Sequence, residues 1–439
     1  MKITFIGAGS TVFTRNLIGD CLYVPELKDS EFALYDIDGE RLEQSKQIAT
    51  AILKTMNSNG KVTTFLGVEK RKEALKNSTF VINTIQVGGY NPSTIIDFEI
   101  PKKYGLQQTI GDTLGIGGIM RALRTIPVVN DIAEEMEEVC PDAFFLNYSN
   151  PMAMISGYLQ TYTKIKTVGL CHSVQVCVKN LFDSLGMNEK IDGHKELIAG
   201  INHMAWLLEI KDKEGKDLYP EIKSKIQEHL NKESFWDKVR YDYIKNFGYY
   251  CTESSEHNAE YNNFYIKRNY PELIQKYNIP LDEYPRRCIK QINEWKECYQ
   301  NVLNNVEKPQ ERSREYGSHI MEAITTGRVT KIAGNVLNTE GVIANLPREA
   351  CVEVPCLVDA YGIHPCSIGK LPVQCAAMNR TNINVQLLAI EAAKTKKIDY
   401  IYQAAMLDPH TSSELDIDTI KKMVDELINA HGEYLPKYN

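Results

Sequence analysis

The sequence predicts an α/β fold in which a doubly wound parallel sheet is joined by a second α+β lobe packed on it. Through the first third of the chain, short apolar runs alternate with helical patterns. This alternation is typical of a parallel sheet with crossover helices. From about residue 195 it gives way to long polar helical segments rich in Tyr and Asn, so we expect a different architecture there.

The apolar runs and helical patterns locate the elements of the first lobe. We expect strands at 2–6, 31–35, 79–83, 142–146 and 166–169, helices at 41–55, 120–139 and 174–185, and a pair of strands within 198–209. No low-complexity linker separates the lobes, so we expect them to pack together. We place the boundary near residue 190, which gives domains of 1–190 and 191–439.

Composition and charge exclude several classes of protein. A formal net charge of -7 argues against non-specific nucleic-acid binding, which needs a basic surface. No unbroken apolar span reaches the roughly 20 residues that cross a bilayer, and the N-terminus carries no signal-peptide pattern. The 11 cysteines include no CxxC pair, which favours free thiols. We therefore expect a cytoplasmic protein that binds neither nucleic acid nor membrane.

A glycine turn, GAGS, follows the first expected strand and opens a helix, which is the context of a dinucleotide fingerprint. Gly7 would permit the tight turn. Gly9 and Ser10 would bring backbone N–H groups to a pyrophosphate at the helix N-terminus. The third glycine position falls on Val12, so the fingerprint is incomplete. The first lobe is therefore expected to be Rossmann-like.

Asp36 ends the second expected strand, where a carboxylate accepts hydrogen bonds from ribose hydroxyls. This favours NAD over NADP, because a 2′-phosphate would be repelled. Alternatively, the segment 36–38 only caps the next helix, and both roles are compatible. Asn83, at the end of the third expected strand, is a further cofactor-binding candidate at the same sheet edge.

Polar residues also follow the later strands at this edge, where ligands of doubly wound sheets gather. Asn150 lies in the turn NYSNP, and Cys171 begins the segment CHS. Cys171 and His203 are plausible metal ligands because thiolate and imidazole both coordinate divalent metals. The alternatives are ordinary turn chemistry at Asn150, a small buried hydrophobe at Cys171 and a core histidine at His203. Spacing alone leaves them open.

A set of motifs in fixed order resembles glycoside hydrolase family four over essentially the whole chain. The motifs are GAGS (7–10), DTLGIGGIMRALRT (112–125), NYSNP (147–151), GLCHS (169–173), GINHM (200–204), TESSEHNAEY (252–261), YPRRC (284–288) and DPHT (408–411). This family departs from two-carboxylate glycosidase chemistry. The resemblance implies hydrolysis through oxidation of the sugar at C3 by NAD, elimination between C1 and C2, addition of water and re-reduction, with a divalent metal.

The resemblance also implies roles for single residues. Cys171 and His203 match the metal ligands, and Tyr261 matches the base that removes the C2 proton. His172 occupies the position of a proposed acid in some phospho-sugar relatives. The positions that match sugar contacts are Asn150, Asn202 and Arg287. A free tyrosine titrates near 10, so Tyr261 would need a neighbouring cation, the metal or Arg287, to act as phenolate.

The metal and the sugar follow from the family as well. Thiolate and imidazole alone would predict zinc, but the family resemblance implies Mn²⁺. The motifs are most similar to the α-galactosidase branch, so the expected substrate is a terminal α-galactoside such as melibiose. An α-glucosidase is one alternative. An α-galacturonidase is another, in which Arg121 or Arg124 would pair with the sugar carboxylate.

Two rival interpretations lie outside the family. A metal-independent lactate/malate-type dehydrogenase shares the N-terminal fold and an Asn-Pro turn, so the overall architecture is expected to be lactate/malate dehydrogenase-like in either case. A non-catalytic dinucleotide sensor is the second rival. For the hydrolase we expect a homodimer or homotetramer.

Overall fold

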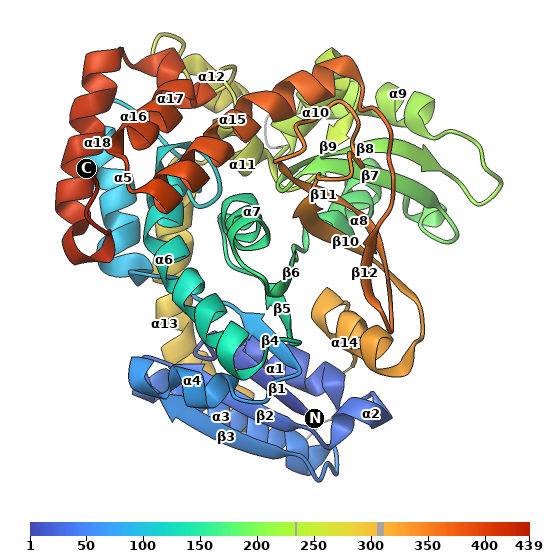
Figure 1. Ribbon diagram of the computed structural model, residues 1–439. Helices are drawn as coiled ribbons and strands as arrows, with labels where there is room; N and C mark the ends of the chain where they lie inside the picture. Colours follow the sequence, from blue (N-terminus) through green and yellow to red (C-terminus); the bar gives the residue numbers. More distant parts are fainter. Residues whose placement is uncertain (233–234, 305–310) are drawn as a thin grey trace.

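The computed structural model describes residues 1–232, 235–304 and 311–439 (Figure 1). Six parallel strands form one half of its sheet in the order β3-β2-β1-β4-β5-β6. This is the strand order of a doubly wound Rossmann fold, so the expected fold class is confirmed. The six strands are β1 (Lys2–Ile6), β2 (Glu31–Asp36), β3 (Lys61–Leu66), β4 (Phe80–Asn83), β5 (Phe144–Asn147) and β6 (Lys166–Gly169).

Helices connect and cover these strands, as right-handed crossovers between parallel strands require. They are α1 (Thr11–Cys21), α2 (Pro25–Lys28), α3 (Gly39–Thr55), α4 (Arg71–Leu75), α5 (Ile95–Lys103), α6 (Gly115–Val139), α7 (Met152–Tyr162) and α8 (Ser173–Leu185). In Figure 1 this lobe runs from the blue strands at the bottom to the green helices at the centre.

The carboxyl ends of four parallel strands lie level with one another. Ile6 pairs with Asn83, Asn83 with Asn147, and Asn147 with Gly169. The segments that follow these residues therefore leave the sheet at one edge. They are the glycine turn, the segment after β4, the NYSNP turn and the CHS segment.

The second half of the sheet is antiparallel and continues from the first. Its strands are β10 (Thr330–Leu337), β11 (Cys351–Asp359), β12 (Gly362–Pro365), β7 (Lys195–Ile201), β8 (Met204–Lys211) and β9 (Tyr250–Cys251). The two halves of the sheet are joined where Asn335 of β10 pairs with Gly169 of β6. A Cβ at Gly169 would lie 2.8 Å from the Asn335 Cβ, so only glycine permits this close approach of the two strands.

The remaining helices enclose the second half and return to the first. They are α9 (Tyr219–Leu230), α10 (Lys238–Phe247), α11 (Ser255–Glu260), α12 (Glu272–Lys276), α13 (Glu283–Asn304), α14 (Tyr316–Thr326), α15 (Val373–Thr395), α16 (Ile398–Leu407), α17 (Pro409–Glu414) and α18 (Ile417–His431). Helix α13 packs back on α3, where the Trp295 indole N–H donates to Gln44 Oε1 at 2.8 Å. The two lobes are thus in contact.

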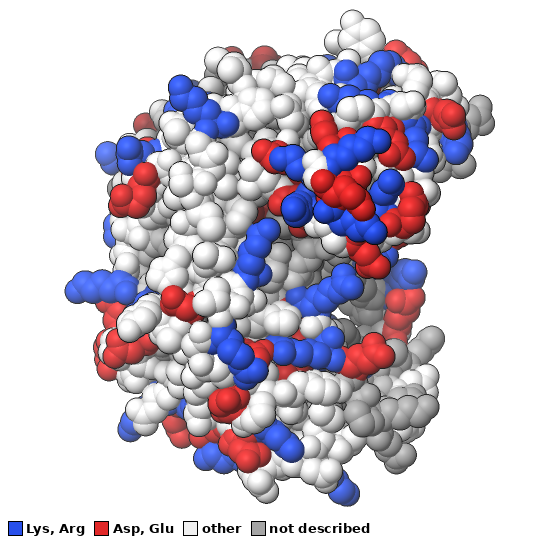
Figure 2. Space-filling model, turned by 90° about the vertical axis from the view of Figure 1, so that its right-hand side faces the viewer, with Lys and Arg blue, Asp and Glu red and all other residues white. Residues whose placement is uncertain are grey.

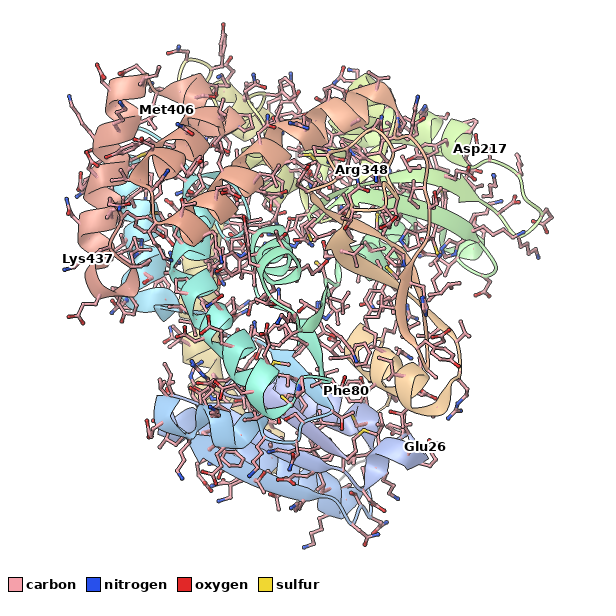
Figure 3. All side chains as sticks on the ribbon, viewed as in Figure 1. Glu26, Phe80, Asp217, Arg348, Met406 and Lys437 are labelled. Carbon is pink, nitrogen blue, oxygen red and sulfur yellow. The ribbon has the colours of Figure 1, made fainter. Side chains whose placement is uncertain are left out.

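Two clusters of buried side chains hold the fold together. The larger spans the parallel sheet and the C-terminal helices, and the smaller lies between α8, α9 and the β7–β8 hairpin. Phe80, the first residue of the inner strand β4 (labelled in Figure 3), belongs to the larger cluster and packs against Phe144 with ring centroids 6.1 Å apart. Burial of such side chains supplies the main favourable term in folding.

The surface carries charges of both signs. On the face drawn in Figure 2, Lys and Arg side chains are interspersed with Asp and Glu side chains among the residues shown in colour. Within the described ranges, every helix is too short or too polar to cross a membrane.

Candidate active site and metal centre

The glycine turn after β1 is sterically constrained. Gly7 has a φ of +82°, a conformation that other residues rarely adopt. A Cβ there would lie 3.0 Å from the backbone of Thr84 and Ile85. The N–H of Gly9 donates to Oδ2 of Asp36 at 2.6 Å, which ties the turn to the end of β2. The turn therefore opens onto α1 in a single fixed shape.

The two roles considered for the segment 36–38, ribose binding and helix capping, fall on different residues. Asp38 caps α3 by accepting a hydrogen bond from the N–H of Arg41 at 3.1 Å. Asp36 accepts from Asp38 through Oδ1 and from Gly9 through Oδ2, so it braces the glycine turn. Each carboxylate oxygen keeps further acceptor capacity, and the half-buried Asp36 can still accept a ribose hydroxyl.

Ser10 and Asn83 flank this turn in different environments. Ser10 is exposed at the start of α1, and its N–H donates to the Gly7 carbonyl. Asn83 is buried, and its Nδ2 donates to Asn147 Oδ1 at 2.9 Å. Asn83 Oδ1 accepts no hydrogen bond from the described residues. Because buried polar atoms normally have a partner, this oxygen suits a bound donor.

Cys171 and His203 come from different lobes and lie side by side. Cys171 follows β6, and His203 lies in the turn between β7 and β8. The Cys171 Sγ and His203 Nε2 atoms are 3.3 Å apart, and His203 is 4% exposed. Divalent transition metals bind both thiolate and imidazole. The two donors therefore fit a divalent transition metal.

Glu253 adds a third ligating group, which was not predicted from the sequence. It follows β9, and its Oε2 lies 3.5 Å from His203 Nε2. One ligand atom from each of Cys171, His203 and Glu253 lies within 4.8 Å of the others. We call these three residues the metal cluster. Glu253 lies in the TESSEH motif, but its proximity to His203 depends on the pairing of β9 with β8 and could not be predicted from the motif.

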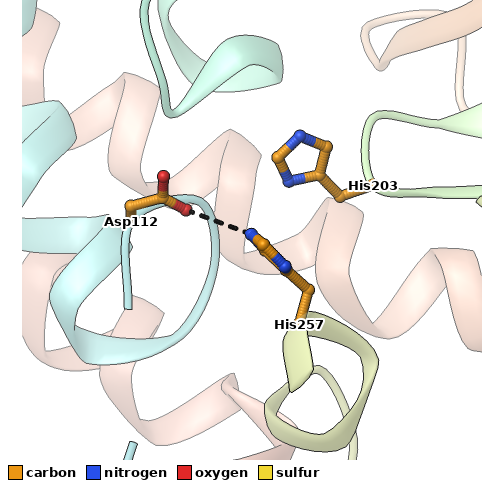
Figure 4. Close-up of side chains that lie close together, drawn as sticks. All are labelled: Asp112, His203 and His257. Atoms are coloured by element: carbon orange, nitrogen blue, oxygen red, sulfur yellow. Dashed lines mark ion pairs between the residues drawn. The ribbon is translucent and has the colours of Figure 1, made fainter. Parts of the chain in front are cut away.

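Asp112 and His257 form a second group that shares His203 (Figure 4). The His257 Nε2 atom lies 3.9 Å from Asp112 Oδ1, and the His203 and His257 ring centroids are 5.1 Å apart. Both residues lie in motifs that resemble those of the family, Asp112 in DTLGIGGIMRALRT and His257 in TESSEHNAEY. A carboxylate and an imidazole in two motifs of the family were the only sign in the sequence that these residues belong to the site.

The Tyr261 hydroxyl reaches the same imidazole from the other side. Tyr261 follows α11 and is fully buried. Its hydroxyl oxygen lies 3.3 Å from His203 Nδ1, and Thr113 Oγ1 lies 3.1 Å from that nitrogen. His203 therefore contacts Cys171 through Nε2 and Tyr261 through Nδ1. The expected metal ligands and the expected base meet at one ring.

The charges around His203 shift the pKa values of both partners. Burial alone would lower the pKa of His203, but the adjacent Glu253 and Cys171 outweigh burial and raise it to about 10. Burial raises the pKa of Tyr261 well above its ordinary value, and the nearby Asp112 carboxylate adds to this effect. A cation beside Cys171 would lower both pKa values.

Arg287 was one of the two cations expected beside Tyr261, but its guanidinium pairs with other residues. Its Nε donates to Glu283 Oε1 at 2.9 Å, and its Nη2 donates to Glu256 Oε1 at 3.1 Å. Both carboxylates lie close because α13 begins at Glu283 and passes α11. Of the two cations proposed to favour a phenolate, the metal is therefore the one that the geometry supports.

Asn150 and Asn202 each carry an unpaired amide oxygen. Asn150 Nδ2 donates to Asp112 Oδ2 at 3.3 Å, and Asn202 Nδ2 donates to Glu353 Oε1 at 3.4 Å. The Oδ1 atoms of both residues are buried and have no hydrogen-bond partner among the described residues. Such oxygens suit the hydroxyl donors of a sugar.

His172 has contacts separate from those of the metal cluster. Its Nε2 lies 2.5 Å from Glu315 Oε1, and its ring packs near Phe13 and Tyr148. The hydrogen bond with Glu315 raises the pKa of His172. The side chain is half exposed. Although His172 follows Cys171 in the chain, its side chain faces α1 and the segment before α14.

Arg124, which we had considered as a reader of a sugar carboxylate, is part of a buried ion pair. Its Nη2 donates to Asp97 Oδ2 at 2.6 Å, and the two side chains are 0% and 3% exposed. His431 of α18 also contacts Asp97, at 2.8 Å. This position for Arg124 leaves it no free face for substrate.

We expect Arg124→Gln to lower the free energy of unfolding by about 3–5 kcal/mol, because it leaves Asp97 buried beside one partner instead of two. Urea unfolding measures the change. Arg328→Gln is the matched control: its side chain is 63% exposed and pairs with Glu26 and Glu322, so its loss should cost at most about 1 kcal/mol. Equal stability of the two variants would contradict a structural role for Arg124.

Comparison with known proteins identifies the family. The model of the family 4 glycosyl hydrolases matches residues 2–187, and the model of their C-terminal domain matches residues 198–411. An α-galactosidase of Bacillus subtilis (strain 168) is 58% identical over 437 residues, which cover 100% of this chain and 99% of the relative.

Solved structures show the same fold. A 6-phospho-α-glucosidase from gut microorganisms, solved in complex with NAD and Mn²⁺, superposes with a TM-score of 0.80 at 20% identity and covers 100% of this chain and 99% of its own. A malate dehydrogenase of Plasmodium falciparum has a TM-score of 0.52 at 13% identity, covering 91% and 99%. The dehydrogenase-like architecture is confirmed, and with the family models spanning most of its length, this chain belongs to family 4 of the glycosyl hydrolases.

Proposed function

We propose that this enzyme is an α-galactosidase that hydrolyses terminal α-galactosides such as melibiose with the help of NAD and Mn²⁺. The observation that carries the proposal is the meeting of Cys171 and Tyr261 at opposite nitrogens of His203. The 58% identity to a relative named α-galactosidase supports the choice of sugar. A lactate- or malate-type dehydrogenase has no need of this arrangement.

Two sets of residues would hold the cofactors. Gly7, Gly9, Ser10 and Asp36 would hold NAD at its pyrophosphate and ribose, with Asn83 at the same sheet edge. Cys171 and His203 would hold Mn²⁺. When bound, NAD supplies reversible hydride exchange at C3 of the sugar, and Mn²⁺ supplies Lewis-acid polarisation of the sugar oxygens.

Tyr261 would remove the proton from C2 once C3 is a ketone, and would later return it. This base works as a phenolate, and the neighbouring His203 assists it. If Nε2 of His203 binds the metal, its proton would lie on Nδ1. A hydrogen bond from this N–H to the Tyr261 oxygen favours the charged form of the tyrosine. Water then adds at C1 after the aglycone has left.

We propose His172 as the acid that protonates the leaving aglycone. The hydrogen bond with Glu315 raises the pKa of His172, which increases the protonated fraction of the imidazole at a given pH. Its half-exposed position beside Phe13 would suit an aglycone that extends from the sugar toward α1. Asn150, Asn202 and Arg287 would contact the sugar hydroxyls.

The partners of the arginines favour a neutral sugar over a galacturonide. Arg124 is neutralised by Asp97, and Arg287 by Glu283 and Glu256. Arg121 donates to the Asn150 carbonyl and to the Tyr284 hydroxyl. A sugar carboxylate gains most from a guanidinium that is free for bidentate pairing. None of these three arginines offers one, which supports the galactoside.

Isotope incorporation tests the proposal. Hydrolysis of p-nitrophenyl α-galactoside in D₂O should place deuterium at C2 of the released galactose, because the redox route breaks the C2–H bond and direct displacement leaves it intact. Mass spectrometry of the product measures the label. Omission of NAD, of Mn²⁺ or of the thiol reductant should each stop the reaction, and p-nitrophenyl α-glucoside serves as the comparison substrate. Unlabelled galactose formed without NAD would mean a conventional glycosidase.

The domain boundaries, the cellular location and the oligomeric state are also part of the proposal. We propose domains of 1–190 and 191–439, which is supported by the separate family models at 2–187 and 198–411. We propose a cytoplasmic location, supported by free thiols at all ten cysteines whose side chains are described. We propose a homodimer or homotetramer, which size-exclusion chromatography with light scattering would test.

A further inference from the structure

Glu253 is placed opposite His203 by the pairing of β8 with β9. Trp206 pairs with Cys251, and the pairing extends one step further, where the N–H of Thr252 donates to the Ala205 carbonyl at 2.8 Å. Glu253 follows the end of β9, and His203 immediately precedes the start of β8, which is the adjacent strand end. Backbone hydrogen bonds thus hold the two side chains at the same end of the ladder.

Both residues adopt an unusual backbone conformation. His203 has a φ of +63° and Glu253 a φ of +69°. Most of the other non-glycine residues with positive φ in the described chain are Asn or Asp, which tolerate this region, and the single exception is Lys396. A left-handed conformation costs roughly 1–2 kcal/mol for residues with larger side chains, and such strain clusters at ligand-binding sites. Here it turns an imidazole and a carboxylate toward one point.

The spacing of the donor atoms matches that of ligands around one cation. His203 Nε2 lies 3.3 Å from Cys171 Sγ and 3.5 Å from Glu253 Oε2. Metal–ligand bonds of about 2.0–2.3 Å place neighbouring ligand atoms roughly 3–3.8 Å apart. The Glu253 side chain is 23% exposed and keeps acceptor capacity on Oε2. The geometry therefore admits a cation between all three side chains.

We propose that Glu253 is the third protein ligand of the divalent cation held by Cys171 and His203, a role that rests on the proposed function. A carboxylate supplies the hard oxygen that a thiolate–imidazole pair lacks. Hard oxygen ligands suit manganese, whereas sulfur and nitrogen alone favour zinc. Glu253 thus shifts the metal preference of the cluster from zinc toward manganese.

A rival role for Glu253 is to neutralise the two histidines without touching metal. Its Oε1 lies 3.5 Å from His257 Nδ1, while Oε2 faces His203. The two roles differ in how the preference between Mn²⁺ and Zn²⁺ changes when the carboxylate becomes an amide of the same size. Loss of a purely neutralising charge would weaken the binding of Mn²⁺ and Zn²⁺ alike, because both are dications. Loss of an oxygen ligand would weaken the binding of Mn²⁺ more than that of Zn²⁺, so the competition between the two metals separates the roles.

The test is the Mn²⁺ affinity of full-length Glu253→Gln, measured from the electron paramagnetic resonance signal of free Mn²⁺ without any substrate. We expect the dissociation constant for Mn²⁺ to rise at least about 10-fold, the lower end of the cost of losing even an outer partner of a metal site. Competition with Zn²⁺ should shift toward zinc. Glu253→Asp, which keeps the carboxylate on a shorter arm, should recover part of the affinity. Urea unfolding verifies that each variant is folded.

Glu256→Gln is the matched control, because Glu256 lies in the same segment and pairs with Arg287; its Mn²⁺ affinity should equal that of the wild type. An affinity of Glu253→Gln within about twofold of the wild type would overturn the inference and leave the proposed function standing. Wild-type hydrolysis without deuterium at C2 would instead overturn the proposed function, whatever the Mn²⁺ affinities are.

Discussion

Replacing Tyr261 with Phe should lower kcat by about 10²–10⁴-fold, the contribution of a positioned general base, with little change in the KM for the galactoside. Phenylalanine fills the same buried volume but cannot take the C2 proton. A group that acts only in the transition state changes kcat and kcat/KM together. Steady-state kinetics with p-nitrophenyl α-galactoside, and NAD titration by fluorescence, give the required values.

The pH dependence gives a second readout of the same residue. Burial raises the pKa of Tyr261 well above its ordinary value, so the phenolate fraction grows as the pH rises, and the wild-type kcat should rise with pH over the alkaline limb. Tyr265→Phe is the matched control, because the Tyr265 hydroxyl donates to Asp242 at 3.0 Å, away from His203. Near-normal turnover of Tyr261→Phe would show that Tyr261 is not the base.

Cys171→Ser and His203→Ala should each reduce activity by at least about 10²–10³-fold, the range for removing one group that stabilises charge in the transition state. Each variant removes a donor from the metal cluster while leaving the glycine turn intact, so NAD affinity should be close to that of the wild type. Mild thiol oxidation should inactivate the wild type, and reductant should restore it, because the thiolate is the ligand.

Metal analysis and activity assays on the same preparations measure this effect. Cys366→Ser is the matched control, since this partly buried thiol follows β12, outside the metal cluster. It should keep full activity and full metal content. If Cys171→Ser turned over substrate normally after its metal had been removed, the assignment of the metal site would be wrong.

Much of the parallel sheet was predictable because its inner strands are buried on both faces and appear as continuous apolar runs. The expected strands at 2–6 and 166–169 match β1 and β6. The edge strand β3 was missed, since its residues alternate between exposed and half-buried and form no apolar run. Helix α6 begins at Gly115, before the expected Met120, because its glycines pack against neighbouring backbone: a Cβ at Gly117 would lie 2.4 Å from the Gly111 carbonyl oxygen.

By itself, the sequence determined which residue types follow the strands at one sheet edge, and from these came the NAD turn, Cys171 and the family resemblance. Local pattern is sufficient there, because a strand and the turn after it are neighbours in the chain. Only the tertiary structure decided which side chains meet. Cys171, His203 and Glu253 follow or precede strands β6, β8 and β9, and pairing between distant strands brings them together. The same applies to charge: Arg124 and Arg287 look equally free in the sequence, yet buried or adjacent carboxylates already hold both, because a charge removed from water needs a partner.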